Sequence, residues 1–475
     1  MPPLPQTPTV AIAGGGLAGL AAGCALAEAG FRVSLFERRP YLGGRASSYQ
    51  HPGTGEVVDN CQHVLLGCCT NLLDFYRRAG VEDKIRWYEK LTFLEPGGRV
   101  SEIAPSFLPA PLHTAPAFLR AECLNFRDKL AISRAMAALA PSAPADCGES
   151  FLDWLKRHGQ TPQAIERFWK TILVSALNED LDQVSVPYAA QVVRESFLKS
   201  AAAGRMGIPT VPLTDLYSTA GDYVRARGGE IQFRASLESF QMEGFEVSVT
   251  ANGQKQKFDY LVLALPFDAL GRVLPDAASA APLAAALEQF STSPITGIHL
   301  WFDRQISDLD HAVLLDRTIQ WMFHKSRIIA ARNQEMLSPG SQANGGSYIE
   351  LVVSSSRSLV EKSKTEIVEM AIKEAQEFFP HAPDAVLLKS TVIKEVHATY
   401  SPRPGVDRYR PQPQTAWPRV FLAGDWTATG WPATMEGAVR SGYLAAEAVA
   451  KFAGRKNVGF LVPDLAPSGL MRFFK

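Results

Sequence analysis

A glycine-rich turn near the amino terminus contains the residue types that bind the diphosphate of a dinucleotide. Gly14, Gly16 and Gly19 fit the pattern G-x-G-x-x-G, and Leu17 and Ala18 lie between the last two glycines. Glycine permits a tight turn at the first position, close approach of the backbone to a pyrophosphate at the second, and close packing of a helix on a strand at the third. A helix that begins here would offer free N–H groups and a partial positive charge to the phosphates.

The acid that such a site uses to bind ribose hydroxyls is Glu37. It follows Gly19 at close to the spacing of about 20 residues that is typical of this fingerprint. The next two residues, Arg38 and Arg39, leave a 2′-phosphate, and hence NADP, open as an alternative. The acid argues against that alternative, because NADP sites use an arginine where NAD sites use an acid.

A second glycine turn comes soon after the acid. Gly43 and Gly44 precede Arg45. Paired glycines let the backbone approach a ligand closely, and the arginine adds a fixed cation for a pyrophosphate. A plain surface turn is the alternative interpretation.

A third turn lies near the other end of the chain. Residues 420–423 form a predicted strand that runs into Gly424 and Asp425, and Asp425 would bind the ribityl chain or a pyrophosphate-linked group. After a short loop, Thr434 and Met435 open a predicted helix. The positive end of that helix suits the N1–C2=O region of a flavin, where reduction places negative charge.

Strands and helices must position these turns. The sequence predicts a strand over 9–13, a helix over 20–29 and a strand over 31–36, which together with the glycines and the acid indicate a dinucleotide-binding fold. The uncharged segment 10–27 has about the length of a membrane span. Its glycines, and the lack of a preceding Lys or Arg, favour a buried strand, turn and helix instead.

The composition is that of an ordinary globular protein. The 475 residues include 48 Lys and Arg against 48 Asp and Glu, and this neutral balance argues against a nucleic-acid partner. None of the 6 cysteines forms a CxxC pair, which argues against a zinc site or a disulfide framework and favours a reducing cytoplasm. The 9 histidines include no closely spaced pair, so no metal site is expected.

Together the motifs resemble those of the FAD-dependent amine oxidase and carotenoid desaturase superfamily. The resemblance implies an α/β fold in which a Rossmann-like FAD-binding domain is interleaved with a mixed α+β substrate domain. No cysteine lies between Trp426 and Trp431, so FAD is expected to be bound non-covalently. The implied FAD contacts are Gly14, Gly16, Leu17, Ala18, Gly19, Glu37, Arg38, Gly43, Gly44, Arg45, Leu237, Gly424, Asp425, Thr434 and Met435.

The predicted domains alternate along the chain. The FAD-binding domain is expected to comprise 1–86, 205–266 and 390–455, the substrate domain 87–204 and 267–389, and the carboxyl-terminal tail 456–475.

Within the superfamily, residues 58–68, 108–113 and 423–436 resemble hydroxysqualene dehydroxylases. This resemblance implies a long polyprenyl substrate and an external electron donor of unknown identity. Loss of an allylic hydroxyl requires an acid, for which His63 and Asp59 are the candidates. The alternatives are a hydrogen bond from His63 to a loop carbonyl, and a bracing or capping role for Asp59.

Three other functions stay open: a carotenoid or dehydrosqualene desaturase, a flavin amine oxidase, and a flavin-free carrier of prenyl lipids. The apolar, charge-free segment 103–119 is a candidate for peripheral contact with the inner face of a membrane. The alternative is a proline-rich loop packed on its own domain, since interfacial helices usually carry basic residues.

Overall fold

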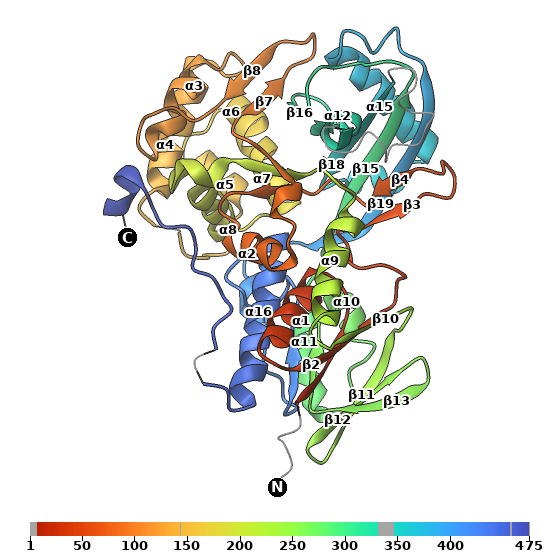
Figure 1. Cartoon of the computed structure of the whole chain (residues 1–475). Coiled ribbons are helices and arrows are strands. Elements are labelled where there is room, and N and C mark those ends of the chain that lie inside the picture. Colours follow the sequence, from red (N-terminus) through yellow and green to blue (C-terminus); the bar gives the residue numbers. More distant parts are fainter. Residues whose placement is uncertain (1–6, 143, 331–345, 457, 475) are drawn as a thin grey trace.

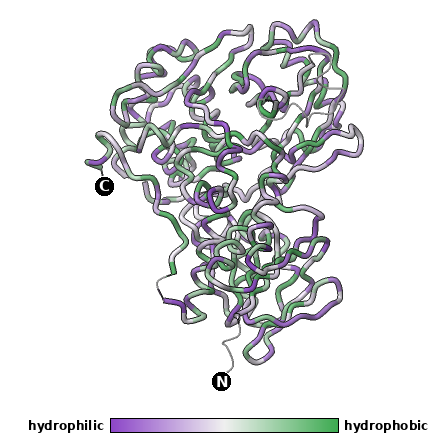
Figure 2. Tube along the Cα trace, viewed as in Figure 1, coloured by the Kyte–Doolittle hydropathy of each residue, from purple (hydrophilic) through white to green (hydrophobic). Residues whose placement is uncertain are grey.

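A computed structural model of the chain describes residues 7–142, 144–330, 346–456 and 458–474. Figure 1 shows two lobes, with the described amino-terminal strand in the lower lobe and the carboxyl terminus beside the upper one. Apolar stretches run through the interior of both lobes, while many of the outer loops are hydrophilic (Figure 2). The polypeptide passes between the lobes several times, and one hydrophobic cluster contains residues of both lobes.

The lower lobe is built on a five-stranded sheet in which every pair is parallel. The strand order is β10 (Glu230–Phe233), β2 (Arg32–Glu37), β1 (Thr9–Ala13), β14 (Tyr260–Leu263) and β20 (Val420–Leu422). Strands β1, β14 and β20 are almost entirely apolar and buried because both faces of the sheet are covered there, whereas the edge strand β10 contains polar residues and is partly exposed.

Alternate residues of strand β1 point to opposite faces of the sheet and pack in different hydrophobic clusters. Val10 and Ile12 pack with the helices α1 (Leu17–Glu28) and α16 (Met435–Phe452). Ala11 and Ala13 face the opposite way and share a core with the antiparallel sheet. That sheet consists of β11 (Leu237–Glu243), β12 (Glu246–Ala251) and β13 (Gln254–Phe258).

Helix α1 is apolar on all sides because it is surrounded by protein. A Cβ atom on Gly442 of α16 would lie 2.2 Å from the carbonyl oxygen of Ala18, so the glycine lets the two helices touch. In the part of the chain that the structure describes, no helix combines the length and the apolar character needed to cross a bilayer. The segment 10–27 thus forms the buried strand, turn and helix that the glycines predicted.

The upper lobe contains a seven-stranded sheet and a group of helices. The strand order is β19 (Leu387–Tyr400), β15 (Thr292–Phe302), β18 (Ser347–Ser354), β17 (Trp321–Phe323), β16 (His311–Leu314), β7 (Leu91–Leu94) and β8 (Val100–Ile103). One face packs on α15 (Lys364–Phe378). The other helices of this lobe include α3 (Ala115–Arg120), α4 (Phe126–Leu139), α5 (Phe151–Arg157), α7 (Thr171–Leu177), α8 (Val186–Val193) and α12 (Lys325–Ala330).

Smaller elements join the lobes. They are β3 (Ser48–Gln50), β4 (Val57–Asp59), β5 (Leu65–Leu66), α2 (Thr70–Ala79), β6 (Ile85–Tyr88), β9 (Met206–Pro209) and α9 (Leu213–Arg225). Strand β6 pairs with β9, whereas β7 and β8 form a hairpin with each other. Strand β19 runs through the predicted domain boundary at 389/390 and remains in the upper sheet up to Tyr400.

Candidate functional site

The first glycine turn lies at the carboxyl ends of β1 and β14. The φ angle of Gly14 is +110°, and a Cβ atom there would lie 2.4 Å from the carbonyl oxygen of Ala264. A Cβ atom on Gly19 would lie 1.9 Å from the carbonyl oxygen of Gly14, so any larger residue would separate the helix from the turn. Helix α1 begins after Gly16 without a side-chain cap, which leaves its first N–H groups for an anion.

Glu37 is buried at the end of β2 and is held by the backbone. Its Oε2 accepts a hydrogen bond from the N–H of Gly15 at 2.7 Å, and its Oε1 accepts one from Arg39 at 2.8 Å. Carboxylate oxygens have further lone pairs, so Glu37 is oriented and still able to bind ribose hydroxyls. Leu237 opens β11 close by, since the N–H of Ala235 donates to the carbonyl of Glu37 at 2.9 Å.

The arginines after Glu37 differ in their placement. Arg38 is exposed, whereas the Nη1 of Arg39 donates to the carbonyl oxygen of Gly44 at 2.9 Å. Arg39 therefore braces the second glycine turn.

The two ends of the chain meet at an ion pair. Nη2 of Arg45 lies 2.7 Å from Oδ1 of Asp425. The second glycine turn also touches the first, because a Cβ atom on Gly44 would lie 2.9 Å from the Cα of Gly16. The N–H of Gly43 donates to the carbonyl oxygen of Gly15 at 2.9 Å. The three turns thus form one cluster, as the sequence predicted for a shared dinucleotide site.

The loop that carries Asp425 is held by Arg410, which the sequence analysis did not single out. Its Nη2 donates to the carbonyl of Asp425 at 3.1 Å, to Oγ1 of Thr429 at 2.9 Å and to the carbonyl of Trp431 at 2.8 Å. Gly424 has a φ of +150° and donates its N–H to Oγ of Ser441 on α16 at 2.8 Å. No local motif marks Arg410, because its partners come from a later loop.

The start of α16 has the expected cap. Oγ1 of Thr434 accepts a hydrogen bond from the N–H of Gly437 at 3.1 Å, and Sδ of Met435 accepts one from the hydroxyl of Tyr217 at 3.5 Å. The next residue, Glu436, is buried and accepts hydrogen bonds at the start of α2, including one from the N–H of Leu72 at 2.7 Å. The amino terminus of α16 is thereby fixed beside the other turns.

Asp59 is buried in an ion pair that only the tertiary structure forms. Its Oδ2 lies 2.6 Å from Nζ of Lys325, and its Oδ1 accepts hydrogen bonds from Oγ of Ser48 at 2.5 Å and from the N–H of Leu213 at 3.3 Å. Burial raises the pKa of Asp59, but the lysine and these hydrogen bonds outweigh it and lower the pKa overall. The structure therefore argues against Asp59 as the acid, since an ionised carboxylate has no proton to give, and it supports the bracing role.

His63 lies in the loop after β4 and is oriented by the backbone. Its Nδ1 lies 2.7 Å from the carbonyl oxygen of Cys61. A carbonyl only accepts, so Nδ1 carries the proton and Nε2 is left as an acceptor in the neutral ring. Burial lowers the pKa of His63. The ring is thus better suited to accept a proton than to donate one at neutral pH, and its geometry favours the alternative interpretation of a hydrogen bond to a loop carbonyl.

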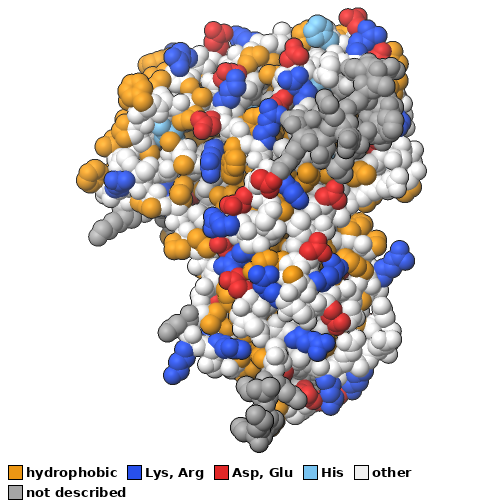
Figure 3. Space-filling model, viewed as in Figure 1, with side chains coloured by type: hydrophobic (Ala, Val, Ile, Leu, Met, Phe, Trp, Pro, Cys, Tyr) orange, Lys and Arg blue, Asp and Glu red, His pale blue; other side chains and the backbone are white. Residues whose placement is uncertain are grey.

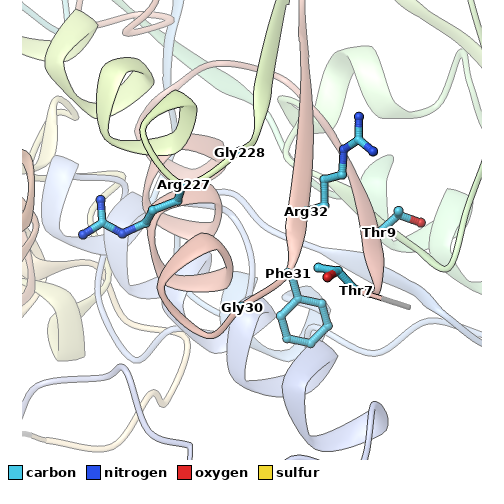
Figure 4. A pocket seen from close by; sticks show the side chains of 7 residues that line it. All are labelled: Thr7, Thr9, Gly30, Phe31, Arg32, Arg227 and Gly228. Carbon is cyan, nitrogen blue, oxygen red and sulfur yellow. The ribbon is translucent and has the colours of Figure 1, made fainter. Parts of the chain in front are cut away.

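A solvent-open pocket of about 610 Å³ lies at the opposite end of the parallel sheet (Figure 4). Its lining residues are Thr7, Thr9, Gly30, Phe31, Arg32, Arg227 and Gly228. Because these residues lie at the start of β1 and β2, the pocket is separate from the glycine turns.

Comparison with known proteins agrees with this geometry. A family described as flavin-containing amine oxidoreductase matches residues 17–450. A 15-cis-phytoene desaturase from Synechococcus elongatus is 28% identical over 462 residues, covering 93% of this chain and 95% of the relative. A probable zeta-carotene desaturase from the same organism is 25% identical, covering 93% and 98%. The solved structure of cyclohexylamine oxidase from Brevibacterium oxydans matches with a TM-score of 0.65 at 17% identity, covering 95% of this chain and 100% of that one.

These comparisons confirm the predicted fold and the cofactor FAD. The relatives found are carotenoid desaturases, whereas the sequence segments predicted hydroxysqualene dehydroxylases. The residues present fit FAD: the uncapped start of α1 suits its pyrophosphate, Glu37 its ribose, and the start of α16 its isoalloxazine.

We predict that Arg45→Met weakens FAD retention. The substitution keeps the aliphatic stem but removes the cation, leaving Asp425 buried without its partner. The FAD-to-protein absorbance ratio after gel filtration should fall at least tenfold. Arg38→Met is the matched control because Arg38 is exposed, and its ratio should stay near that of the unmodified protein. Equal ratios for the two variants would refute a cofactor role for Arg45.

We also predict that Lys325→Met destabilises the fold by about 3–5 kcal/mol, since it leaves the Asp59 carboxylate buried and unpaired. The double variant Lys325→Met, Asp59→Asn should recover most of that loss, because no charge is then left unpaired. Denaturant unfolding of the single and double variants measures both effects. Purely additive losses would show that the pair does not interact.

Proposed function

The chain belongs to the flavin-containing amine oxidoreductase family, and we propose that it is an FAD-dependent desaturase acting on a long polyprenyl hydrocarbon. The observation that carries the proposal is the similarity to two carotenoid desaturases over 93% of this chain. The match extends through the substrate lobe, where members of one fold differ in chemistry. It is therefore more informative about the substrate class than the FAD motifs alone.

The placement of His63 supports desaturation. Forming a double bond removes two hydrogens from neighbouring carbons, one as a hydride and one as a proton. FAD, held by the glycine turns and Glu37, would supply the hydride acceptor. The proton requires a base, and the neutral imidazole of His63 has a free Nε2 for it. Its loop is tied to the cofactor side, because Nδ2 of Asn60 donates to the carbonyl of Arg45 at 3.1 Å.

Reductive dehydroxylation of hydroxysqualene is a second candidate. It would use hydride from reduced FAD and a proton for the departing hydroxyl, so that squalene and water are formed. A buried acid in the upper lobe favours it: burial raises the pKa of Glu350 to about 8, so that this carboxyl holds a proton at neutral pH. The two reactions move electrons in opposite directions, so the first needs an external acceptor and the second an external donor.

Product analysis separates these candidates. The FAD-loaded protein is incubated with phytoene and a quinone under oxidising conditions, and with hydroxysqualene and dithionite under anaerobic conditions. We expect a product two hydrogens lighter than phytoene by mass spectrometry. Squalene formed from hydroxysqualene, without any phytoene product, would overturn desaturation in favour of the second candidate.

Two further arms test the remaining alternatives. Oxidation of a primary amine in preference to both polyprenyl substrates would favour an amine oxidase. A colourless protein that binds the polyprenyl substrates without flavin would favour a lipid carrier.

We further propose that the apolar surface around 103–119 contacts a membrane from which such a substrate is drawn. Phe107 is 97% exposed, and Phe473 from the end of the chain is 83% exposed. The segments are adjacent, since the N–H of Leu470 donates to the carbonyl of Ala110 at 2.8 Å. Figure 3 shows apolar side chains gathered on the side of the upper lobe that carries the carboxyl terminus.

Segment 103–119 has no basic residue of its own, whereas interfacial helices usually carry some. Basic side chains do flank this apolar surface, so that argument against membrane contact does not hold. Arg120, Arg127 and Arg472 are exposed next to its apolar residues in the sequence. Such residues would attract anionic lipids. Part of the segment does pack on its own domain, because the Phe118 ring contacts Phe168 with centroids 5.8 Å apart.

We predict that the double variant Phe107→Asp, Phe473→Asp floats with anionic liposomes at least tenfold less than the unmodified protein. Removing each ring from the bilayer forfeits about 2 kcal/mol of apolar burial. Phe245→Asp in the hairpin between β11 and β12 is the matched control, because Phe245 is 84% exposed in the other lobe. Equal flotation of all three proteins would remove the proposed membrane surface.

A further inference from the structure

One buried face of the seven-stranded sheet carries ionisable residues in strands that are otherwise apolar. His299 of β15 lies directly opposite Glu350 of β18 and opposite Thr391 of β19. Both His299 and Glu350 are 0% exposed. Ionisable side chains are rarely buried unless they are paired, so this row requires an explanation.

Several polar atoms in this row have no hydrogen-bond partner among the described residues. Nδ1 of His299 shares a hydrogen bond with the hydroxyl of Tyr348 at 2.8 Å, but its Nε2 has no partner. Neither carboxyl oxygen of Glu350 forms a short hydrogen bond, although the Nζ of Lys325 and the N–H of Gln62 lie close enough to lower its pKa. Unpaired buried polar atoms are costly, and in folded proteins they are usually satisfied by an ordered water.

The protonation of Glu350 depends on the charged and titratable groups that surround its carboxyl. Lys325 of α12 has its Nζ 3.7 Å from Oε2 of Glu350, but that lysine is engaged by Asp59 of β4 at 2.6 Å and by Oε1 of Gln62 at 2.7 Å. The thiol of Cys61 and the imidazole of His299 are the other titratable groups that face it, apart from the Tyr348 hydroxyl. Two carboxyl groups thus share one lysine, which favours a neutral Glu350.

The unpaired atoms converge on the position that a side chain at residue 297 would take. A Cβ atom built on Gly297 would have as its three nearest neighbours Nε2 of His299 at 3.6 Å, Oε1 of Glu350 at 3.7 Å and the carbonyl oxygen of Asn60 at 3.8 Å. All three neighbours are polar. Glycine inside a strand often marks a place where another group approaches the backbone closely, and here the absence of a side chain leaves that space.

We propose that a buried water molecule occupies the space beside Gly297 and joins Glu350, His299 and Asn60 into one proton-holding unit, which a hydrogen bond of Asn60 links to the second glycine turn. The water would donate one hydrogen to the carbonyl of Asn60. Its second hydrogen and its lone pairs would form hydrogen bonds with His299 and Glu350, whether Glu350 is protonated or ionised. In the described residues, no group of His, Cys, Asp and Glu side chains has the arrangement of a metal site, which favours water over a metal ion.

The unit is connected to the cofactor side through Asn60. The N–H of Asn60 donates to the carbonyl of Ser47 at 2.8 Å, and its Nδ2 donates to the carbonyl of Arg45 at 3.1 Å and to Oε2 of Glu395 at 2.9 Å. When Glu350 loses its proton to the solvent, Lys325 would stabilise the carboxylate that forms, and proton uptake from the solvent restores the neutral acid. The unit would serve either polyprenyl reaction, and it does not depend on which one occurs.

A crystal structure of the FAD-loaded protein tests the water directly. We expect density for one water within hydrogen-bonding distance of Glu350, His299 and Asn60. Gly297→Ala should remove it, because the new methyl group would occupy the same space. Gly271→Ala is the matched control, since its Cβ atom would meet nothing within 4 Å, and it should keep the water. Absence of density in the unmodified protein, or density with the short contacts of a cation, would overturn the proposal.

Infrared titration of the same proteins without substrate tests the proton. We expect a protonated carboxyl band that disappears near pH 8 and is missing in Glu350→Gln. Removing the water should disfavour the ionised form, so Gly297→Ala should raise that midpoint by about one pH unit, a tenfold change in the ionisation constant. Equal midpoints in Gly297→Ala, Gly271→Ala and the unmodified protein would refute the unit. These readouts are independent of whether any polyprenyl product forms.

Discussion

The ion pair between Arg45 and Asp425 is the contact on which the cofactor site depends. It joins residues 380 positions apart, and it exists only because β14 lies between β1 and β20 in the parallel sheet. Since the carboxyl ends of parallel strands meet at one edge, the glycine turns after β1 and β20 are brought together there. Arg39 and Arg410 then hold the two turns that carry the pair.

The glycine turns and helices of the cofactor site pack through backbone contacts that only glycine permits. Gly19 touches Gly14, Gly44 touches Gly16, and Gly442 touches Ala18, at distances that leave no room for a Cβ atom. Such contacts bring α1, the second turn and α16 closer together than side chains would permit. The same geometry leaves the start of α1 uncapped by protein, which is the condition for binding a phosphate there.

The upper lobe buries a cluster of ionisable groups within strands that are otherwise apolar. Asp59, Lys325 and Glu350 lie together in a region shielded from water, and one carboxyl group exceeds the available cations. A hydrophobic replacement would often be at least as stable as such a cluster. Retaining it beside the cofactor turns therefore indicates a chemical role more than a structural one.

Features that depend on neighbouring residues in the chain could be predicted before the fold was known. The spacing of Gly14, Gly19 and Glu37 predicted the first turn and its acid, and the strand before Gly424 predicted the last turn, because local backbone geometry restricts those residue types. The boundaries of β1 agreed as well. The late helix was expected to open at Thr434 and Met435, and Thr434 caps α16.

Which groups are charged and which are paired became evident from the packing of the folded chain alone. The sequence suggested Asp59 as an acid, but Lys325, 266 positions away, holds it ionised. His299 and Glu350 did give a signal, as lone ionisable residues within apolar strands, but their meaning depended on the register of β15 against β18. Proton affinity is set by burial and by charges within a few ångströms, and those distances arise from strand pairing and lobe packing rather than from position along the chain.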